Sequence, residues 1–275
     1  MTRSLTAIRR EIRDTWTEIH AAARTLPEAK DALPLSPTLL GSSTKVGLGE
    51  SLNVLTAVVY MSPADEAFAK GDGRTLCPFA GFCKSVCIGN ETGRMIFAPM
   101  RLSRLWKTTL YLGARRLFRE LLDAEIRAHA AKAKRLGMRA AVRVDGSTDT
   151  GEGADAALRH PDVMFYDYTK VAARAHRFAR GHAANYHLTY SWSERASVAD
   201  ARALLAAGVN VAVAFKRPKH DLPATWLGAS VIDGDLTDVR FADPRGVVVG
   251  LAFKSARRTA AKVAAGVPAG FIVEA

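Results

Sequence analysis

The three cysteines of this chain stand close together in the sequence. They are Cys77, Cys83 and Cys87, and no other position holds a cysteine. Thiolates bind soft metals, in particular zinc and the irons of iron–sulfur clusters. A disulfide would leave one thiol over and is unusual inside cells, and unrelated buried cysteines would be expected to scatter along the chain. The window therefore predicts a metal site.

Two kinds of metal group could use these thiols. Structural zinc takes four ligands, usually from C-x2-C pairs or from cysteines together with histidines. Here the spacing is C-x5-C-x3-C, and no histidine stands near the window, so zinc would need a distant fourth ligand such as His129 or His187. Three thiolates with one open iron position fit a [4Fe-4S] cluster better. We expect the three cysteines to ligate three irons of such a cluster.

The elements that must position this loop begin with an amphipathic segment. Apolar residues recur at intervals of three or four from Leu5 to Ile19, which predicts a helix over 3–25. Prolines follow it. We expect residues 1–37 to form a helical N-terminal extension and linker. Residues 38–275 are then one α/β domain that carries the cysteine loop at about 62–97.

Strands and helices are predicted to alternate along this domain. The predicted strands are 51–61, 139–144, 163–168, 186–191, 209–215, 230–233, 247–253 and 271–273, and the predicted helices are 101–135, 169–180, 194–207 and 255–265. Ser193 is the expected N-cap of the third helix, Gly113 a break in the first and Gly137 its end. This alternation indicates a parallel sheet. Eight strands predict a TIM-barrel-like (β/α)8 fold, distorted or incomplete forms included; a doubly wound open sheet is the alternative.

Polar side chains collect where the predicted strands end. In a barrel these ends form the face that carries catalytic and binding groups, so we expect them to line a cavity for a small molecule beside the metal. The candidates are Asp145, Ser147, Asp167, Lys170, Tyr190, Lys216, Asp233 and Lys254. The alternative is structural, because serine and aspartate at strand ends also cap helices, and Asp167 with Lys170 could form an ordinary ion pair.

The charge of the chain is positive and uneven. The 275 residues carry 39 Lys and Arg against 27 Asp and Glu, a net charge of +12. The segment 94–139 is especially basic and could contact nucleic-acid phosphates, although the outer face of a barrel helix would have the same composition. No run of apolar residues is long enough for a membrane span, and the N-terminus has charges where a secretory signal needs apolar residues. We therefore expect a cytoplasmic protein that does not bind membranes.

The cysteine loop follows the first predicted strand, at the catalytic face of a barrel. In this arrangement the chain resembles the radical S-adenosylmethionine superfamily, in which a three-cysteine loop holds a [4Fe-4S] cluster whose fourth iron binds the methionine part of the cofactor. That superfamily usually has C-x3-C-x2-C, whereas this chain has C-x5-C-x3-C. The resemblance is one of architecture, and it leaves S-adenosylmethionine binding open.

A second resemblance rests on motifs in chain order, from about residue 39 to the end. The most specific is FYDYTK at 165–170, accompanied by VDGSTD at 144–149, YHLTYS at 186–191, VIDGD at 231–235 and the cysteine window. Together they resemble a bacteriophage family known as gene product 88-like. The resemblance implies a viral origin and supports metal binding by the cysteines, but it implies no particular reaction.

The leading hypothesis is therefore a phage-encoded iron–sulfur protein acting in the host cytoplasm. It would be a radical-SAM-like or other iron–sulfur-dependent enzyme, or a protein whose cluster has a redox or structural role. The alternative is a basic nucleic-acid-binding phage protein with a structural zinc site. A virion component without a catalytic role is a third hypothesis that these residues do not separate from the other two.

Overall fold

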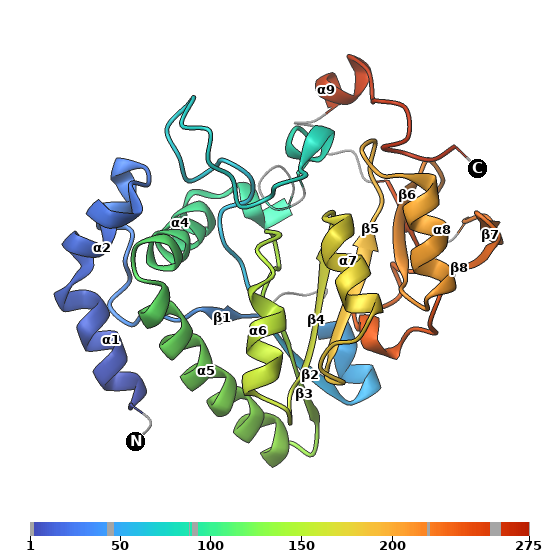
Figure 1. The fold of residues 1–275 in the computed structure, drawn as a ribbon. Helices are drawn as coiled ribbons and strands as arrows, with labels where there is room; N and C mark the ends of the chain where they lie inside the picture. The colour runs from blue at the N-terminus through green and yellow to red at the C-terminus, as the bar shows by residue number, and fades with distance from the viewer. Residues whose placement is uncertain are drawn as a thin grey trace.

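The fold is built on one mostly parallel β-sheet (Figure 1). The computed structural model describes residues 3–42, 47–87, 89, 93–218, 221–253 and 260–274. Within them, nine strands lie in the order β1-β2-β3-β4-β5-β6-β9-β8-β7. Their bounds are β1 Leu40–Gly41, β2 Val54–Val59, β3 Arg139–Arg143, β4 Met164–Thr169, β5 Tyr186–Ser191, β6 Val211–Phe215, β7 Thr225–Trp226, β8 Ala229–Asp233 and β9 Val248–Ala252. The two short edge strands, β1 and β7, pair antiparallel with their neighbours, and the other pairings are parallel.

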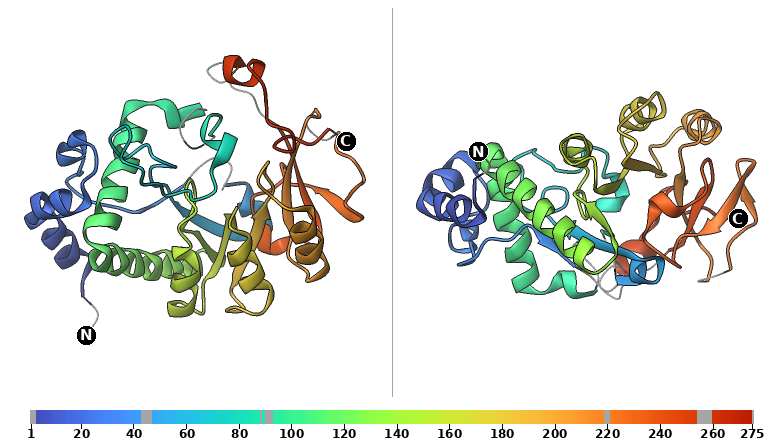
Figure 2. Two further views of the ribbon diagram at one scale, coloured as in Figure 1. Left: turned by 45° about the horizontal axis from the view of Figure 1, so that its top comes forward. Right: turned by 90° about the horizontal axis from the view of Figure 1, so that it is seen from below.

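Helices connect the successive parallel strands from β2 to β6 and lie in front of the sheet in Figure 1; Figure 2 shows them from two further directions. The α-helices are α1 Leu5–Asp14, α2 Trp16–Ala23, α4 Ala98–Gly113, α5 Arg115–Arg135, α6 Glu152–Arg159, α7 Ala172–Ala179, α8 Val198–Ala206 and α9 Ala260–Ala264. Short 3-10 turns are η1 Pro27–Asp31, η2 Leu48–Leu52, η3 Gly81–Lys84, η4 Gly93–Ile96 and η5 Arg240–Ala242. Because right-handed crossovers between neighbouring strands place their helices on one face, the opposite face is free to carry a site.

The prediction of an α/β fold with a parallel sheet and helical N-terminal region is confirmed, but the described strands do not close into an eight-stranded barrel. The consecutive order from β2 to β6 is the one a barrel would have, and it differs from a doubly wound sheet, whose strand order reverses near its centre. The sheet nevertheless ends at β1 and β7. The predicted last strand, 271–273, does not bridge this gap. Val273 bonds instead to Ala214 and Lys216 at the end of β6, with N–O distances of 2.9 and 3.0 Å.

Several predicted helices have different ends in the structure. The first is divided at Thr15 into α1 and α2, and the long one is divided after Gly113 into α4 and α5. The helix predicted at 194–207 begins only at Val198, because the Ser197 side chain caps it while Ser193 lies buried in the preceding loop. Helix α6 was not predicted. Of the predicted helix at 255–265, α9 accounts for the end, and residues 255–259 lie outside the described part of the chain.

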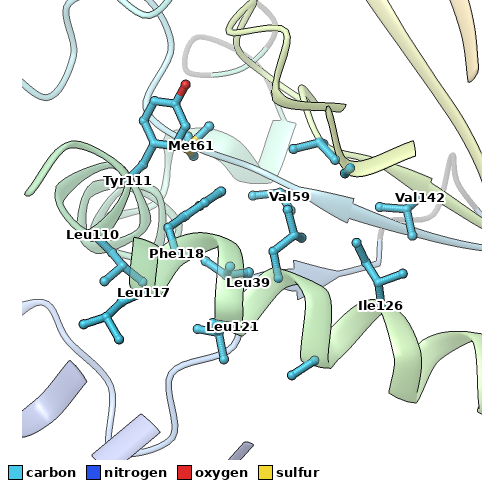
Figure 3. Packing of buried hydrophobic residues seen from close by; sticks show 14 of the residues in the cluster. Leu39, Val59, Met61, Leu110, Tyr111, Leu117, Phe118, Leu121, Ile126 and Val142 are labelled. Carbon is cyan, nitrogen blue, oxygen red and sulfur yellow. The ribbon is translucent and has the colours of Figure 1, made fainter. Parts of the chain in front are cut away.

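The main hydrophobic core lies between the helices and the sheet (Figure 3). Leu110, Phe118 and Leu121 from α4 and α5 pack there with Val59 and Val142 of the sheet. The N-terminal helices belong to the same core through four buried residues, Ile8, Ile12, Trp16 and Ile19. Burying these side chains stabilises the docking of α1 and α2 onto α4 and α5.

A second, smaller cluster occupies the other face of the sheet. Val54, Ala141 and Tyr166 point away from the helices and pack against Val239 and Phe241, which flank or belong to η5. The segment between β8 and β9 thus fills part of the face opposite the helices. The site described below lies on this same face, toward the C-terminal ends of the strands.

None of the described helices combines the length and the apolar character that crossing a membrane requires.

We expect Gly113→Ala to destabilise the protein by about 1–3 kcal/mol, the usual cost of forcing extra atoms into a packed site. A Cβ at Gly113 would lie 2.1 Å from the carbonyl oxygen of Ile19, so the α2 backbone would have to move. Gly41→Ala is the matched control, since its Cβ would meet only the Val58 carbonyl oxygen, at 3.8 Å. Urea unfolding of both variants measures the difference. Equal stability of the two would contradict this account of how α2 docks.

Candidate functional site

A cavity of about 270 Å³ lies between the cysteine loop and the C-terminal ends of the parallel strands. Parallel strands bring their carboxyl ends to one edge of a sheet, so residues distant in sequence meet there. The structure brings six of the candidate residues to this cavity: Cys77, Cys83, Cys87, Asp145, Ser147 and Lys170. No disulfide joins the three cysteines, and all three are partly buried.

Two further candidates lie away from the cavity because side chains alternate between the two faces of a strand. Tyr190 points toward the helices and is buried in the core beside α7 and α8, whereas its neighbour Ser191 lines the cavity. Asp167 also points toward the helices. The prediction gave every polar residue at a strand end the same role. Successive side chains of a strand point to opposite faces, and this alternation turns Tyr190 and Asp167 away from the cavity.

The remaining candidates lie elsewhere or outside the described residues. Lys216 is largely exposed and pairs with Glu274 at 2.6 Å. Asp233 accepts a hydrogen bond from the backbone N–H of Asp235 at 2.8 Å, in the turn after β8 near the edge of the sheet. Neither lines the cavity. Lys254 lies outside the described part of the chain.

Two of the three thiols receive hydrogen bonds from backbone amides. The Ala64 N–H donates to Cys77 Sγ at 3.2 Å, and the Gly89 N–H donates to Cys87 Sγ at 3.3 Å. Burial, followed by the neighbouring thiols, raises the pKa of Cys77 to about 12. Amide donors aimed at sulfur favour an anionic thiolate, which is the form that ligates metals.

The turn that carries Cys83 is held by a carboxylate from the loop between β5 and α8. The Phe82 N–H donates to Glu194 Oε1 at 2.7 Å. Gly81 permits this approach, because its φ is +51° and a Cβ there would lie 1.9 Å from the same oxygen. Phe82 also packs edge-on against Phe271, with ring centres 5.1 Å apart. Glu194 was not predicted from the sequence, because the glycine inside the cysteine window is the only local sign that a carboxylate approaches this turn.

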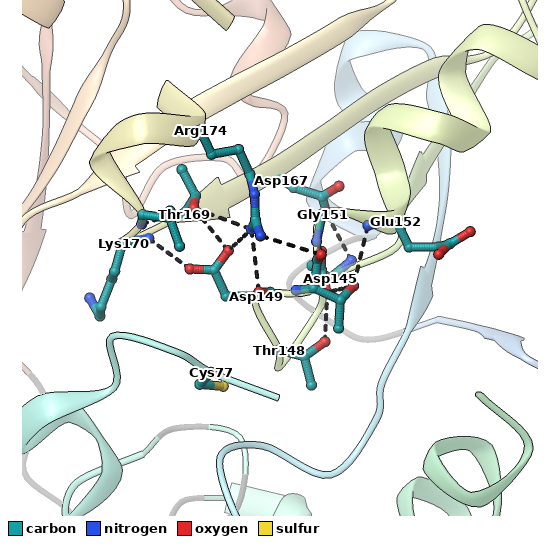
Figure 4. A network of polar contacts seen from close by, with 12 residues as sticks. Cys77, Asp145, Thr148, Asp149, Gly151, Glu152, Asp167, Thr169, Lys170 and Arg174 are labelled. Atoms are coloured by element: carbon teal, nitrogen blue, oxygen red, sulfur yellow. Dashed lines mark hydrogen bonds and ion pairs between the residues drawn. The ribbon is translucent and has the colours of Figure 1, made fainter. Parts of the chain in front are cut away.

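Asp145 organises the loop between β3 and α6 (Figure 4). Its carboxylate accepts hydrogen bonds from Thr148 Oγ1 at 2.7 Å, from both the N–H and the hydroxyl of Thr150, and from the Gly151 N–H at 2.7 Å. With four donors its two oxygens are well satisfied. This carboxylate therefore shapes the cavity wall and has little capacity left for a ligand.

Asp149 ties the same loop to the start of α7. It accepts from the Thr169 hydroxyl at 2.9 Å and the Lys170 N–H at 2.8 Å, and it forms an ion pair with Arg174. Burial raises the pKa of Asp149, an effect that the Arg174 charge opposes. Beyond these contacts, Lys170 Nζ donates to Ser191 Oγ at 2.8 Å. Figure 4 shows Cys77 on one side of this network and Lys170 beside it.

Asp167 lies behind the cavity wall, between β4 and α6. It is only 1% exposed, and its Oδ1 accepts from the Asp145 N–H at 2.8 Å. Its Oδ2 has no hydrogen-bond partner among the described residues and faces Gly153, where a Cβ would lie 2.0 Å away. Burial, with the nearby Asp145 charge, raises the pKa of Asp167 well above its usual range. Burial therefore favours the protonated form of this side chain, which holds the Asp145 backbone N–H.

The sequence pattern did not point to a polar pair on the sheet side of the cavity. Arg143 and Asp238 both line it, with 3.2 Å between Nη1 and Oδ2. The Arg143 guanidinium lies 4.7 Å from the centre of the Tyr168 ring, and burial raises the pKa of Tyr168 to about 12. Arg143 stands inside a predicted strand, between the buried residues Val142 and Val144. Because side chains alternate along a strand, this pattern could have placed Arg143 on the cavity face.

The histidines named as distant zinc ligands are engaged elsewhere. His129 Nε2 lies 3.0 Å from the Leu55 carbonyl oxygen and 3.2 Å from that of Ala141. His187 lines a separate cavity and contacts the Phe241 ring. In the part of the chain that the structure describes, no three His, Cys, Asp or Glu side chains converge so as to hold a single metal ion.

Five of the twelve basic residues in the segment 94–139 pair with carboxylates. Arg104 is buried and pairs with Glu66 at 2.6 Å. The other ion pairs of the segment are Arg101–Glu28, Arg115–Glu152, Arg116–Glu120, Arg116–Glu11, Arg119–Glu152 and Arg119–Asp155. Much of its charge therefore holds α4 and α5 to the rest of the fold.

We expect the stability of the wild type to fall relative to that of Asp167→Asn as the pH rises above about 4, the pKa of an aspartate in the unfolded chain. The pKa of Asp167 is raised in the folded state, so over this range the folded chain keeps a proton that the unfolded chain releases. Wild-type stability then falls by about 1.4 kcal/mol for each pH unit relative to the variant. Urea unfolding at several pH values measures it, with Asp162→Asn, an exposed residue, as control. A stability difference that does not change with pH would contradict the raised pKa of Asp167.

Comparison with known proteins gives one match. No curated protein and no solved structure is detectably similar to the chain. The family model described as "Gene product 88" matches residues 36–266, which is most of the sequence and includes every residue that lines the cavity except Phe271. The protein therefore belongs to the gene product 88 family.

Proposed function

We propose that the protein binds a [4Fe-4S] cluster through Cys77, Cys83 and Cys87, with the fourth iron facing the cavity. The observation that carries this proposal is that three thiols from one loop line a single cavity beside polar strand ends. A cluster attaches each thiolate to a different iron. Thiols that surround a space therefore suit a cluster, whereas a single metal ion requires thiols that meet at one point.

Structural zinc receives less support from the geometry. A zinc ion requires its sulfur ligands at about 2.3 Å from one centre, and the described residues offer no such convergent set. Both histidines that could have completed the site lie elsewhere. The amide bonds to Cys77 and Cys87 sulfur are of the kind that tunes a cluster's potential.

The finer proposal is an iron–sulfur enzyme whose sheet resembles a radical-SAM-like barrel left open. Its support is the consecutive order from β2 to β6, with the cysteine loop directly after β2. A bound cluster would supply one-electron chemistry at its open iron, where S-adenosylmethionine or another small molecule would bind. The chain itself shapes the cavity through Asp145 and Asp149 and fixes the cysteine turn through Glu194.

Nucleic-acid binding by the basic segment is the second candidate function, and the ion pairs weaken it. Counterion release requires cations that are free to meet phosphates, whereas five arginines of α4 and α5 already contact carboxylates. Salt-dependent DNA binding that leaves the metal content unchanged would favour this function over the cluster.

We expect anaerobically purified protein to be brown and to contain about four irons and four sulfides per chain. Cys77→Ser, Cys83→Ser and Cys87→Ser should each lower the iron content severalfold, because each removes a ligand. Ser85→Ala, in the same loop, is the control and should keep full iron content. Colourless protein with one tightly bound zinc would overturn the proposal, as would unchanged iron in the cysteine variants.

Loss of the Glu194 contact should destabilise a bound cluster without removing a ligand. In Glu194→Ala the Phe82 N–H loses its acceptor, so the turn that carries Cys83 is held less firmly. We expect the cluster absorption to bleach several times faster in air than in wild type. Glu28→Ala, which removes an exposed ion pair with Arg101, should bleach at the wild-type rate. Identical rates for the two variants would show that Glu194 does not support the cysteine turn.

A further inference from the structure

We infer that the cavity binds a small organic anion whose carboxylate or phosphate group is held by Lys170 Nζ and Ser191 Oγ. This deepens the proposed function by naming the class of molecule beside the cluster, and its role as a substrate rests on that function. The anion site itself is argued from the cavity and does not require the cluster.

The cations that line the cavity differ in their partners. Lys84 pairs with Asp65, and Arg143 pairs with Asp238. Lys170 Nζ instead donates to a neutral hydroxyl, Ser191 Oγ, at 2.8 Å. Among the described residues it is the cavity cation without a carboxylate partner. A partly buried ammonium in this state gains from an anion that reaches it.

The acids of the cavity are already occupied and do not compete for Lys170. Asp145 is saturated by four donors from its own loop. Asp149 is bound by Arg174 and by the Lys170 backbone N–H, and Asp238 is bound by Arg143. An incoming anion would therefore accept hydrogen bonds from the remaining N–H groups of the ammonium and from the hydroxyl. It would not have to displace a carboxylate.

The rest of the cavity fits the apolar part of such a molecule. Ala212 and Ala214 on β6 have small side chains that leave space, and Leu251, Trp192 and Phe271 complete an apolar wall. The Trp192 ring is fixed by a hydrogen bond from Nε1 to the Gly270 carbonyl oxygen at 2.6 Å. A volume of about 270 Å³ lies just below the range of roughly 300–1,000 Å³ common for drug-sized ligands. The ligand is therefore small, with a charged end and an apolar end.

Carboxylates and phosphates share the chemistry recognised here, namely oxygens that accept from an ammonium and a hydroxyl. The test compares phenylacetate, phenyl phosphate and the neutral phenylacetamide as probes on the full-length protein, by calorimetry or ligand-observed NMR. We expect at least one anion to bind and the amide to bind about tenfold more weakly, a difference of about 1.4 kcal/mol. The anion that binds more tightly shows whether the site prefers a carboxylate or a phosphate.

Variants locate the binding site. Lys170→Met should weaken anion binding about tenfold or more, and Lys170→Arg should restore part of it because the charge is kept. Lys216→Met, which removes an exposed lysine that pairs with Glu274 outside the cavity, is the matched control and should bind as wild type does. Circular dichroism checks that each variant is folded. The comparison of anion with amide on wild-type protein tests the inference even if a variant fails to fold.

Three results would overturn the inference. They are equal binding of amide and anions, no effect of Lys170→Met, and no binding of either anion at about 10 mM, roughly tenfold above the Kd of a weak site. Iron analysis of the same samples keeps the two proposals apart. Protein that lacks iron and yet binds an anion through Lys170 would overturn the cluster alone. Protein with a full cluster and no anion binding would overturn this inference alone.

Discussion

The alternation of side chains along parallel strands that end at one edge of the sheet is the constraint on which the site depends. It sends Val142 and Phe165 into the core under the helices and turns Arg143, Tyr168 and Ser191 toward the cavity. Because β3, β4 and β5 are neighbours in the sheet as well as in the chain, their terminal loops lie side by side. The buried contact from the Asp145 N–H to Asp167 then joins the loop after β3 to strand β4. The cysteine loop completes the enclosure from the opposite side.

The sequence predicts the parts of the fold that depend on local pattern. The parallel strands were found because buried runs such as YHLTYS are bounded by turns, and β5 has the predicted bounds. Closure of the sheet depends on where 271–273 goes, and only tertiary contact decides that it joins β6. In the site, the cysteines and Lys170 were found from residue type. Glu194, Arg143 and Asp238 were not predicted because their partners are far away in sequence. Tyr190 was predicted to line the cavity, but the alternation of side chains along β5 turns it toward the helices.

The positive charge has a different meaning once its partners are known. Most arginines of α4 and α5 hold neighbouring elements through ion pairs, as Arg104 does with Glu66 in the cysteine loop. Net charge alone therefore says little about a ligand. The informative cation is Lys170, which faces the cavity with a hydroxyl as its side-chain partner. A single unmatched charge at a concave, mostly apolar site indicates a ligand more directly than a basic composition does.

We propose that three thiols around one cavity hold a cluster of several irons. Mössbauer spectroscopy of protein prepared anaerobically with iron-57 distinguishes such a cluster from a single metal ion. We expect the spectrum of a [4Fe-4S] cluster in which one iron differs from the other three and changes when a small ligand is added to the cavity. A single mononuclear site, or iron that remains when Cys77, Cys83 and Cys87 are all replaced by serine, would contradict it.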